Sequence, residues 1–218
     1  KGKRLMDNVP KYKCTYISPS TMRSITHTFR NRYWIEENLP INMEEIITKH
    51  LPLEIIPEPG ILENYDIDAF LTSDLSGIVV DLDQYMFGDE KTSNRLRFSF
   101  AHEIGHYVLH RSIFENFSPE NEEDYIDFYK NFPETDYSQF EWQANEFAGS
   151  LLVPRHILVK ITDDKIQEKR QAGFSELLQK YPEDILERLS GELCKPFGVS
   201  HHVIELRLKV EGLWPPQK

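Results

Sequence analysis

The stretch "RFSFAHEIGHYVLH", residues 97–110, carries three histidines and one glutamate in a largely apolar run. Apolar residues at this density predict a helix packed into the core, and we expect it to extend from about Ser93 to about Phe114. Histidine and glutamate side chains in such a helix need polar partners, because burial of an unpaired polar group is unfavourable. The run therefore predicts a binding site built on a helix.

The first two histidines have the spacing of a metal-binding pair. His102 and His106 are four residues apart, which places both imidazoles on one helix face, with Cβ atoms about 5–6 Å apart. A zinc ion with Zn–N bonds of about 2.1 Å can bridge them. Glu103 is rotated by about 100° from His102, where a general base can take a proton from bound water. The alternative for this His-Glu-x-x-His pattern is two core histidines bonded to backbone groups.

His110, the third histidine, cannot share that ion. It lies eight residues beyond His102, a rise of about 12 Å along a straight helix. We therefore expect His110 to be structural or to orient one of the ligands. A hydrolytic site also needs a donor for the oxyanion, and the residues available for this are His110, Tyr107, Tyr125 and Tyr137.

A second helix should supply the third ligand. The segment "SQFEWQANEFAGSLLV" predicts a helix that begins at Ser138 and stops before Pro154. It offers Glu141 and, as a fallback, Glu146, although Ser138 and Glu141 also have the spacing of a capping box. Three small residues on this helix would let the two helices approach closely: Ala144, Ala148 and Gly149.

The rest of the chain predicts an α+β fold that is mainly helical, with a small antiparallel or mixed sheet. Apolar residues from Met22 to Tyr33 recur at helical spacing, and we expect Pro40 to end that helix. Asn42 is the expected N-cap of a second helix. "LEIIPEPG" predicts one strand, and "AFLTSDLSGIVVDLD" predicts two strands joined around residues 73–77. The remainder from residue 155 has helical patterns only.

Composition limits the classes of function. The 218 residues carry a net charge of −11, which argues against broad nucleic-acid affinity. No stretch approaches 18 apolar residues, so we expect no membrane span. Two isolated cysteines and the lack of a secretory signal predict a cytoplasmic protein with reduced thiols. The acidic, aromatic stretch 115–141 is either a solvated loop or a docking surface for a basic partner.

The run "RLRFSFAHEIGHYVLH" followed by "EWQANEFAGSLLVP" resembles the ImmA/IrrE family of metallopeptidases. The shared pattern is Arg-Phe-x-x-Ala before His-Glu-x-x-His, then Glu-x-x-Ala-Asn-x-Phe-Ala and Leu-Leu-x-Pro. The resemblance implies a minimal thermolysin-like zinc peptidase core. It implies His102, His106 and Glu141 as ligands of Zn²⁺ and Glu103 as the catalytic glutamate. A site with such ligands could also take Mn²⁺ or Co²⁺, because metal selection depends on availability as well as geometry. It also implies a protein substrate, a helix-turn-helix repressor whose cleavage relieves repression of stress-response or mobile-element genes.

The expected organisation has three parts. Residues 1–19 form an irregular arm, residues 20–155 the zinc metallopeptidase domain, and residues 156–218 a C-terminal helical segment that resembles a helix-turn-helix around "FGVS". Residues 200–212 offer only two firm cations, Arg207 and Lys209, which argues against DNA binding. Two alternatives to the peptidase remain. One is a non-catalytic docking partner of a repressor or toxin–antitoxin component, and the other is a DNA-binding regulator that uses the C-terminal helices.

Overall fold

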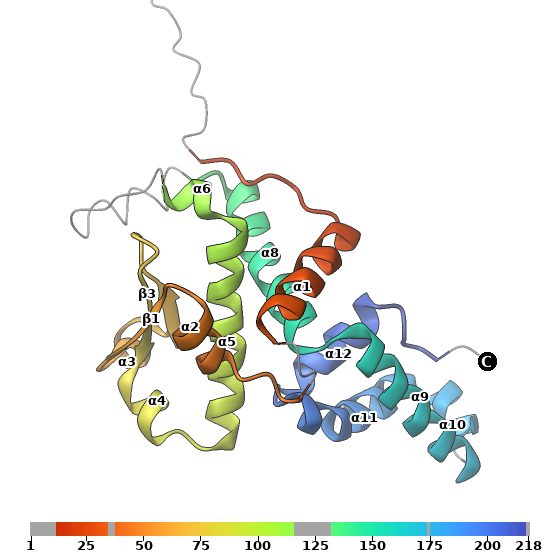
Figure 1. Cartoon of the computed structure of the whole chain (residues 1–218). Helices are drawn as coiled ribbons and strands as arrows, with labels where there is room; N and C mark the ends of the chain where they lie inside the picture. The colour runs from red at the N-terminus through yellow and green to blue at the C-terminus, as the bar shows by residue number, and fades with distance from the viewer. Residues whose placement is uncertain (1–11, 35–37, 116–131, 174, 217–218) are drawn as a thin grey trace, which may run out of the picture.

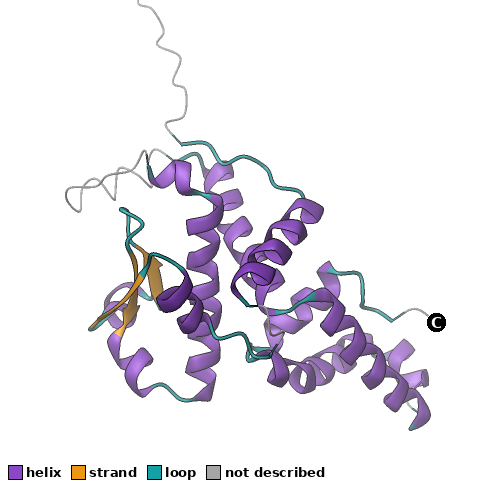
Figure 2. Ribbon diagram, viewed as in Figure 1, coloured by secondary structure: helices purple, strands orange, loops and turns teal. Residues whose placement is uncertain are grey.

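The computed structural model describes residues 12–34, 38–115, 132–173 and 175–216. Figure 1 shows two long helices, α5 and α8, side by side at the centre, with the sheet on one side and the C-terminal helices on the other. Helices predominate over a small sheet (Figure 2), which confirms the expected α+β class. In chain order the elements are α1 (Pro19–Tyr33), α2 (Met43–His50), β1 (Glu54–Glu58), α3 (Ile61–Tyr65), β2 (Ala69–Leu71), β3 (Gly77–Asp81), α4 (Leu82–Phe87), α5 (Glu90–Leu109), α6 (Arg111–Phe114), α8 (Glu134–Leu152), α9 (Arg155–Gln171), α10 (Ser175–Lys180), α11 (Pro182–Phe197) and α12 (His201–Val210).

Capping residues set the limits of the first two helices. The Ser18 hydroxyl accepts a hydrogen bond from the Thr21 backbone N–H, and α1 ends at Tyr33. The expectation that this helix continues to Pro40 is therefore wrong. Asn42 caps α2 as expected, through a 3.1 Å bond from the Glu45 backbone N–H. The Glu45 carboxylate pairs with Lys49 on the next turn and does not close a capping box.

The three strands form one mixed sheet in the order β1-β3-β2. β3 is parallel to β1, with Ile78 opposite Ile55, and antiparallel to β2, with Val79 opposite Phe70. All five residues of β3 are buried, because the strand lies at the centre of the sheet and its own sequence, GIVVD, is almost entirely apolar. The predicted pair of strands joined around residues 73–77 is thus β2 and β3. The short helices α3 and α4 were not expected from the sequence.

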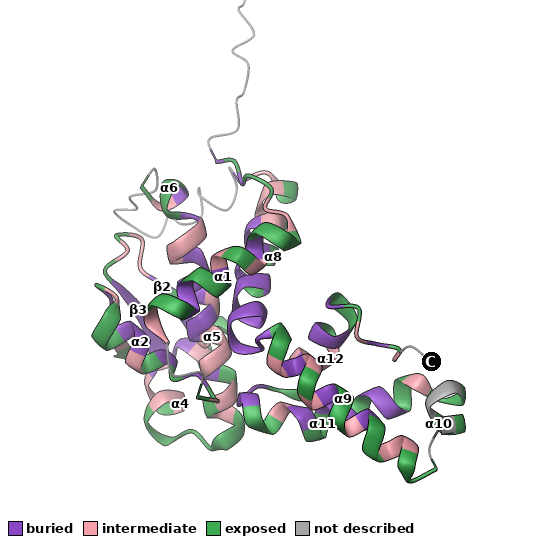
Figure 3. Ribbon diagram, turned by 45° about the vertical axis from the view of Figure 1, so that its right-hand side comes forward, coloured by how far each residue is buried: buried purple, intermediate pink, exposed green. Residues whose placement is uncertain are grey.

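The helix pair α5–α8 crosses at small residues. A Cβ on Gly105 would lie 3.1 Å from Cα and from the carbonyl oxygen of Ala144, so a larger residue would have to push the two backbones apart by a few tenths of an ångström. Buried residues gather where α1, α5 and α8 meet (Figure 3). Gly149, expected to serve the same crossing, instead faces α12, where an added Cβ would lie 3.1 Å from Cδ of Arg207.

Both central helices differ from their predicted limits. α5 begins at Glu90, because the Asp89 carboxylate accepts a 2.8 Å bond from the Thr92 backbone N–H, and ends at Leu109 with the separate turn α6 beyond it. α8 begins at Glu134, one turn before Ser138, and ends before Pro154 as expected. Because Ser138 lies inside α8, it caps no helix, and the capping-box interpretation of Glu141 is wrong.

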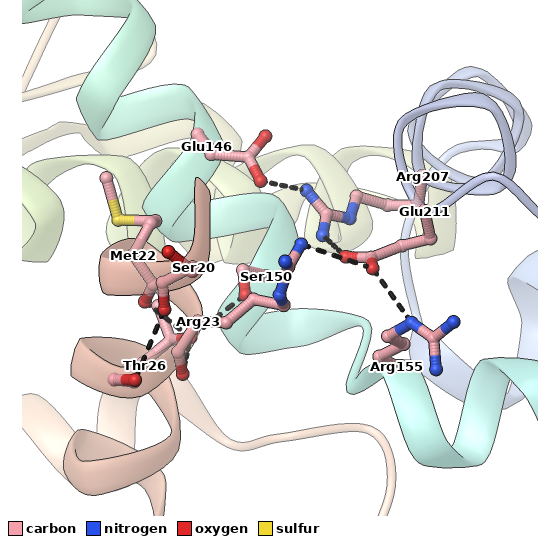
Figure 4. A network of polar contacts seen from close by, with 10 residues as sticks. Ser20, Met22, Arg23, Thr26, Glu146, Ser150, Arg155, Arg207 and Glu211 are labelled. Carbon is pink, nitrogen blue, oxygen red and sulfur yellow. Dashed lines mark hydrogen bonds and ion pairs between the residues drawn. The ribbon is translucent and has the colours of Figure 1, made fainter. Parts of the chain in front are cut away.

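The C-terminal helices are tied to the central pair by a buried ionic network (Figure 4). The guanidinium of Arg207 on α12 donates to Glu146 on α8 at 2.6 Å and pairs with Glu211. Glu211 also lies 3.1 Å from Nε of Arg155 and 3.6 Å from a guanidinium nitrogen of Arg23 on α1. The network therefore joins α1, α8, α9 and the end of α12. No helix that the structure describes is long and apolar enough to cross a membrane.

Candidate metal centre

Three side chains from α5 and α8 converge on one point. Nε2 of His102 and Nε2 of His106 are 3.0 Å apart, and the Glu141 carboxylate oxygens lie 3.4 Å from the first and 3.8 Å from the second. The ligand atoms of a tetrahedral zinc ion with bonds of about 2.1 Å are about 3.4 Å from one another. The three observed separations centre on that value, and among the described residues this group has ligand atoms close enough together to hold a metal ion. The residues present therefore fit a tetrahedral cation.

The lone pair of His102 faces the same point because Asn145 holds its ring. The Asn145 side-chain oxygen lies 3.0 Å from Nδ1 of His102 and accepts the proton there. Neutral His102 consequently presents an unprotonated Nε2 to the cluster. A hydrogen-bond acceptor on the far nitrogen is the usual way in which a metal-binding histidine is oriented.

Glu103 lies beside the cluster and is almost completely buried. One carboxylate oxygen accepts a 2.8 Å hydrogen bond from the backbone N–H of Leu71 on β2, and the other lies 4.0 Å from Nε2 of His102. Burial raises the pKa of Glu103 to about 7, even though the charge of His102 opposes the shift. A carboxylate with a pKa near neutrality suits a residue that both accepts and returns a proton.

The histidines of this helix have different proton affinities. Burial lowers the pKa of His106 well below its ordinary value, and the charges of His102 and His110 act in the same direction. Burial also lowers the pKa of His102, but the hydrogen bond with Glu141 and the charges of Glu103 and Glu141 raise it above the ordinary value. His106 is therefore neutral at physiological pH, which is the form that binds a metal.

The other sequence candidates lie in different surroundings. Glu146, the fallback ligand, is not brought to the histidines, because its carboxylate is paired with Arg207. Tyr107 lines an apolar pocket of about 430 Å³ with residues of α1. Tyr137 lies one turn before Glu141 on α8, with its ring 6.3 Å from that of Phe140. Tyr125 lies outside the described residues.

Sequence reasoning did not identify three groups at this site: the Leu71 backbone N–H, Asn145 and Gln143. Asn145 is four residues after Glu141, so the pair repeats the spacing of His102 and His106 on the facing helix. That matching spacing was a usable signal for Asn145. No local signal identifies the Leu71 amide, because its role depends on how β2 packs against α5.

Comparison with known proteins gave one family match. The model of the IrrE N-terminal-like domain, a peptidase family, matches residues 86–209, which is more than half of the chain. The matched region contains both ligand-bearing helices and extends through most of α12. No curated protein matches the chain significantly.

Proposed function

The chain belongs to the IrrE N-terminal-like peptidase family, and from this premise we propose that it is a zinc-dependent endopeptidase that cleaves a helix-turn-helix repressor. The observation that supports the activity best is the convergence of the three ligand atoms beside a buried carboxylate. A docking protein that only retained the fold would have no need of Glu103 at that position. Family membership and the sequence resemblance support the proposed substrate.

We assign a different chemical role to each residue of the site. His102, His106 and Glu141 would hold the cation, which supplies Lewis-acid chemistry when bound. Glu103 accepts the proton of the attacking water and returns it to the leaving amine. The Leu71 N–H fixes one oxygen of Glu103, so that the other oxygen faces the ligand cluster. Tyr137 is the donor we propose for the oxyanion, because it lies on α8 one turn from Glu141.

The structure weighs against the DNA-binding alternative. Of the two cations in residues 200–212, Arg207 is buried in the ionic network and cannot reach a phosphate. Lys209 is paired at 2.9 Å with Glu183. Neither residue provides the free, clustered positive charge that nucleic-acid binding requires.

Glu103→Gln tests the proposal. We expect the variant to retain one metal ion per chain by elemental analysis and to lose cleavage of a helix-turn-helix repressor supplied as substrate by about 10²–10⁴-fold. Glu187→Gln, an exposed change of the same type on α11, is the matched control and should cleave normally. Cleavage by Glu103→Gln at the wild-type rate, or wild-type protein that binds no metal when Zn²⁺, Mn²⁺ and Co²⁺ are supplied, would overturn the proposal.

A further inference from the structure

A line of hydrogen bonds leads from the N-terminal arm to His106. The backbone carbonyl of Thr15 accepts a 2.7 Å bond from the Gln143 side-chain amide on α8. The oxygen of that amide lies 3.0 Å from Nε2 of His110. Nδ1 of His110 in turn lies 3.0 Å from Nδ1 of His106, whose other nitrogen faces the ligand cluster.

Only one arrangement of protons satisfies this line. A carbonyl can only accept, so the NH₂ group of Gln143 must face Thr15 and its oxygen must face His110. The reverse orientation would bring two carbonyl oxygens together at 2.7 Å. His110 therefore carries its proton on Nε2, and its Nδ1 is an acceptor. His106 must then carry its proton on Nδ1, which leaves the lone pair of its Nε2 free for a metal.

The surroundings leave these groups no better partners. His106, His110 and Gln143 are all buried, and the ring of Phe140 lies 4.2 Å from the centroids of both imidazoles. Within the described part of the chain, the Cys14 thiol also lies 3.9 Å from Nε2 of His110, and a thiol is a weak acceptor. A buried N–H without an acceptor is unfavourable, so loss of the His110 acceptor would favour the His106 tautomer that carries its proton on Nε2. That tautomer cannot bind a metal through Nε2.

We propose that His110 and Gln143 are positioning residues that hold His106 in its metal-binding tautomer, with the Thr15 carbonyl of the arm as the fixed end of the relay. This inference rests on the proposed function. His102 has a simpler arrangement, in which Asn145 alone accepts the proton of Nδ1. The relay makes metal binding at His106 depend on a segment more than 80 residues earlier in the chain.

Substitutions at residue 110 test the relay directly. Asparagine places its side-chain oxygen about where Nδ1 of histidine lies, whereas phenylalanine keeps the ring shape and removes the acceptor. We expect His110→Phe to weaken Zn²⁺ binding by about 10–100-fold in competition with a chelating dye, as for other partners of metal-binding histidines. We expect His110→Asn to recover most of the affinity.

Gln143→Leu tests the next position, and Gln139→Leu, one turn earlier on α8, is its matched control. Long-range ¹H–¹⁵N correlation spectra of the metal-free proteins report the tautomer of each histidine independently of activity. We expect His106 to be protonated at Nδ1 in wild-type protein and in Gln139→Leu. In His110→Phe we expect protonation at Nε2, and in Gln143→Leu a mixture of the two tautomers together with weaker Zn²⁺ binding. Circular dichroism establishes that each variant is folded.

The outcomes separate the two proposals. Folded His110→Phe and Gln143→Leu proteins with the wild-type tautomer and wild-type Zn²⁺ affinity would overturn the relay, even if the wild-type protein is an active peptidase. Wild-type protein that binds no metal would overturn the proposed function, while the tautomers of the metal-free proteins would still decide whether the relay exists. If His110→Phe does not fold, the His106 tautomers and Zn²⁺ affinities of His110→Asn and Gln143→Leu test the relay instead.

Discussion

Removal of the positive charge at the centre of the buried ionic network should destabilise the whole protein. Arg207 is 2% exposed and contacts Glu146, which is 7% exposed, and Glu211 (Figure 4). Replacement by methionine keeps most of the apolar stem and removes the guanidinium. Glu211 keeps two partners, Arg155 and Arg23. The cost should therefore fall mainly on Glu146, which would remain buried without a positive charge beside it.

The expected cost follows from that unpaired carboxylate. Removal of one member of a buried ion pair costs about 3–5 kcal/mol in the free energy of unfolding. For a chain of this size each kcal/mol corresponds to about 2–4 °C, so the melting temperature of Arg207→Met should fall by about 6–20 °C. Lys209→Met is the matched control, two residues later on the same helix. Its pair with Glu183 is exposed, so the change should cost at most about 1 kcal/mol.

Urea unfolding at pH 7 and thermal melting measure the stability of both variants. A double-mutant cycle isolates the interaction energy between Glu146 and Arg207. Glu146→Leu combined with Arg207→Met removes both charges, and this double variant should recover most of the stability lost in Arg207→Met. High salt should weaken the Lys209 pair and leave the buried pair nearly unchanged. An Arg207→Met protein as stable as Lys209→Met, or a double variant no more stable than Arg207→Met, would refute this reasoning.

Three further changes test other parts of the structure. Because burial raises the pKa of Glu103 to about 7 from an ordinary 4.5, this carboxyl holds more protons in the folded metal-free protein than in the unfolded chain between these values, so its own contribution to stability should fall as the pH rises through them. Glu103→Gln should remove this fall in urea unfolding measured from pH 4 to pH 8, and an unchanged pH profile would contradict the assignment. Gly105→Ala should lower the free energy of unfolding by about 1–3 kcal/mol, because the added Cβ meets the backbone of α8. Gly191→Ala in α11 is the control and should raise it by about 0.5–1 kcal/mol, because open space surrounds that glycine. Equal effects of the two changes in denaturant unfolding would disprove the close crossing. Asp81→Ala removes a carboxylate that accepts hydrogen bonds from backbone N–H groups of both α3 and α4, and it should lower the free energy of unfolding by about 1–2 kcal/mol. The control is Asp83→Ala, an exposed change that should be nearly neutral in the same assay. An equal cost for both variants would show that the caps contribute little.

The local part of the site could be predicted from the sequence because helix geometry is a local property. Four residues make slightly more than one turn, so His102 and His106 face the same side in any α-helix that contains them. The same regularity predicted the helix that carries Glu141, and short apolar runs bounded by turn residues predicted β2 and β3. Helix limits were less accurate, since Asp89 and Pro133 act outside the apolar pattern that marked the helices.

Helix spacing alone left the choice between the two glutamates of α8 open; the family resemblance implied Glu141, and the tertiary structure supplies the physical reason. Glu141 and Glu146 are five residues apart, which is roughly 140° around the helix, so only one of them can face α5. The contact of Gly105 with Ala144 sets that rotation, turning Glu141 to the histidines and Glu146 to Arg207.

The sequence by itself determined that two histidines with the spacing of metal ligands and an adjacent carboxylate would lie on one helix. Only the tertiary structure decided which further groups lie around these three side chains: Asn145, His110, Gln143 and the Leu71 amide, together with the carboxylate of Glu141 that the resemblance implied. The physical reason is the range of the interactions. Side chains within one turn are brought together by the backbone hydrogen bonds of the helix itself, whereas groups from different elements meet only through the packing of the core.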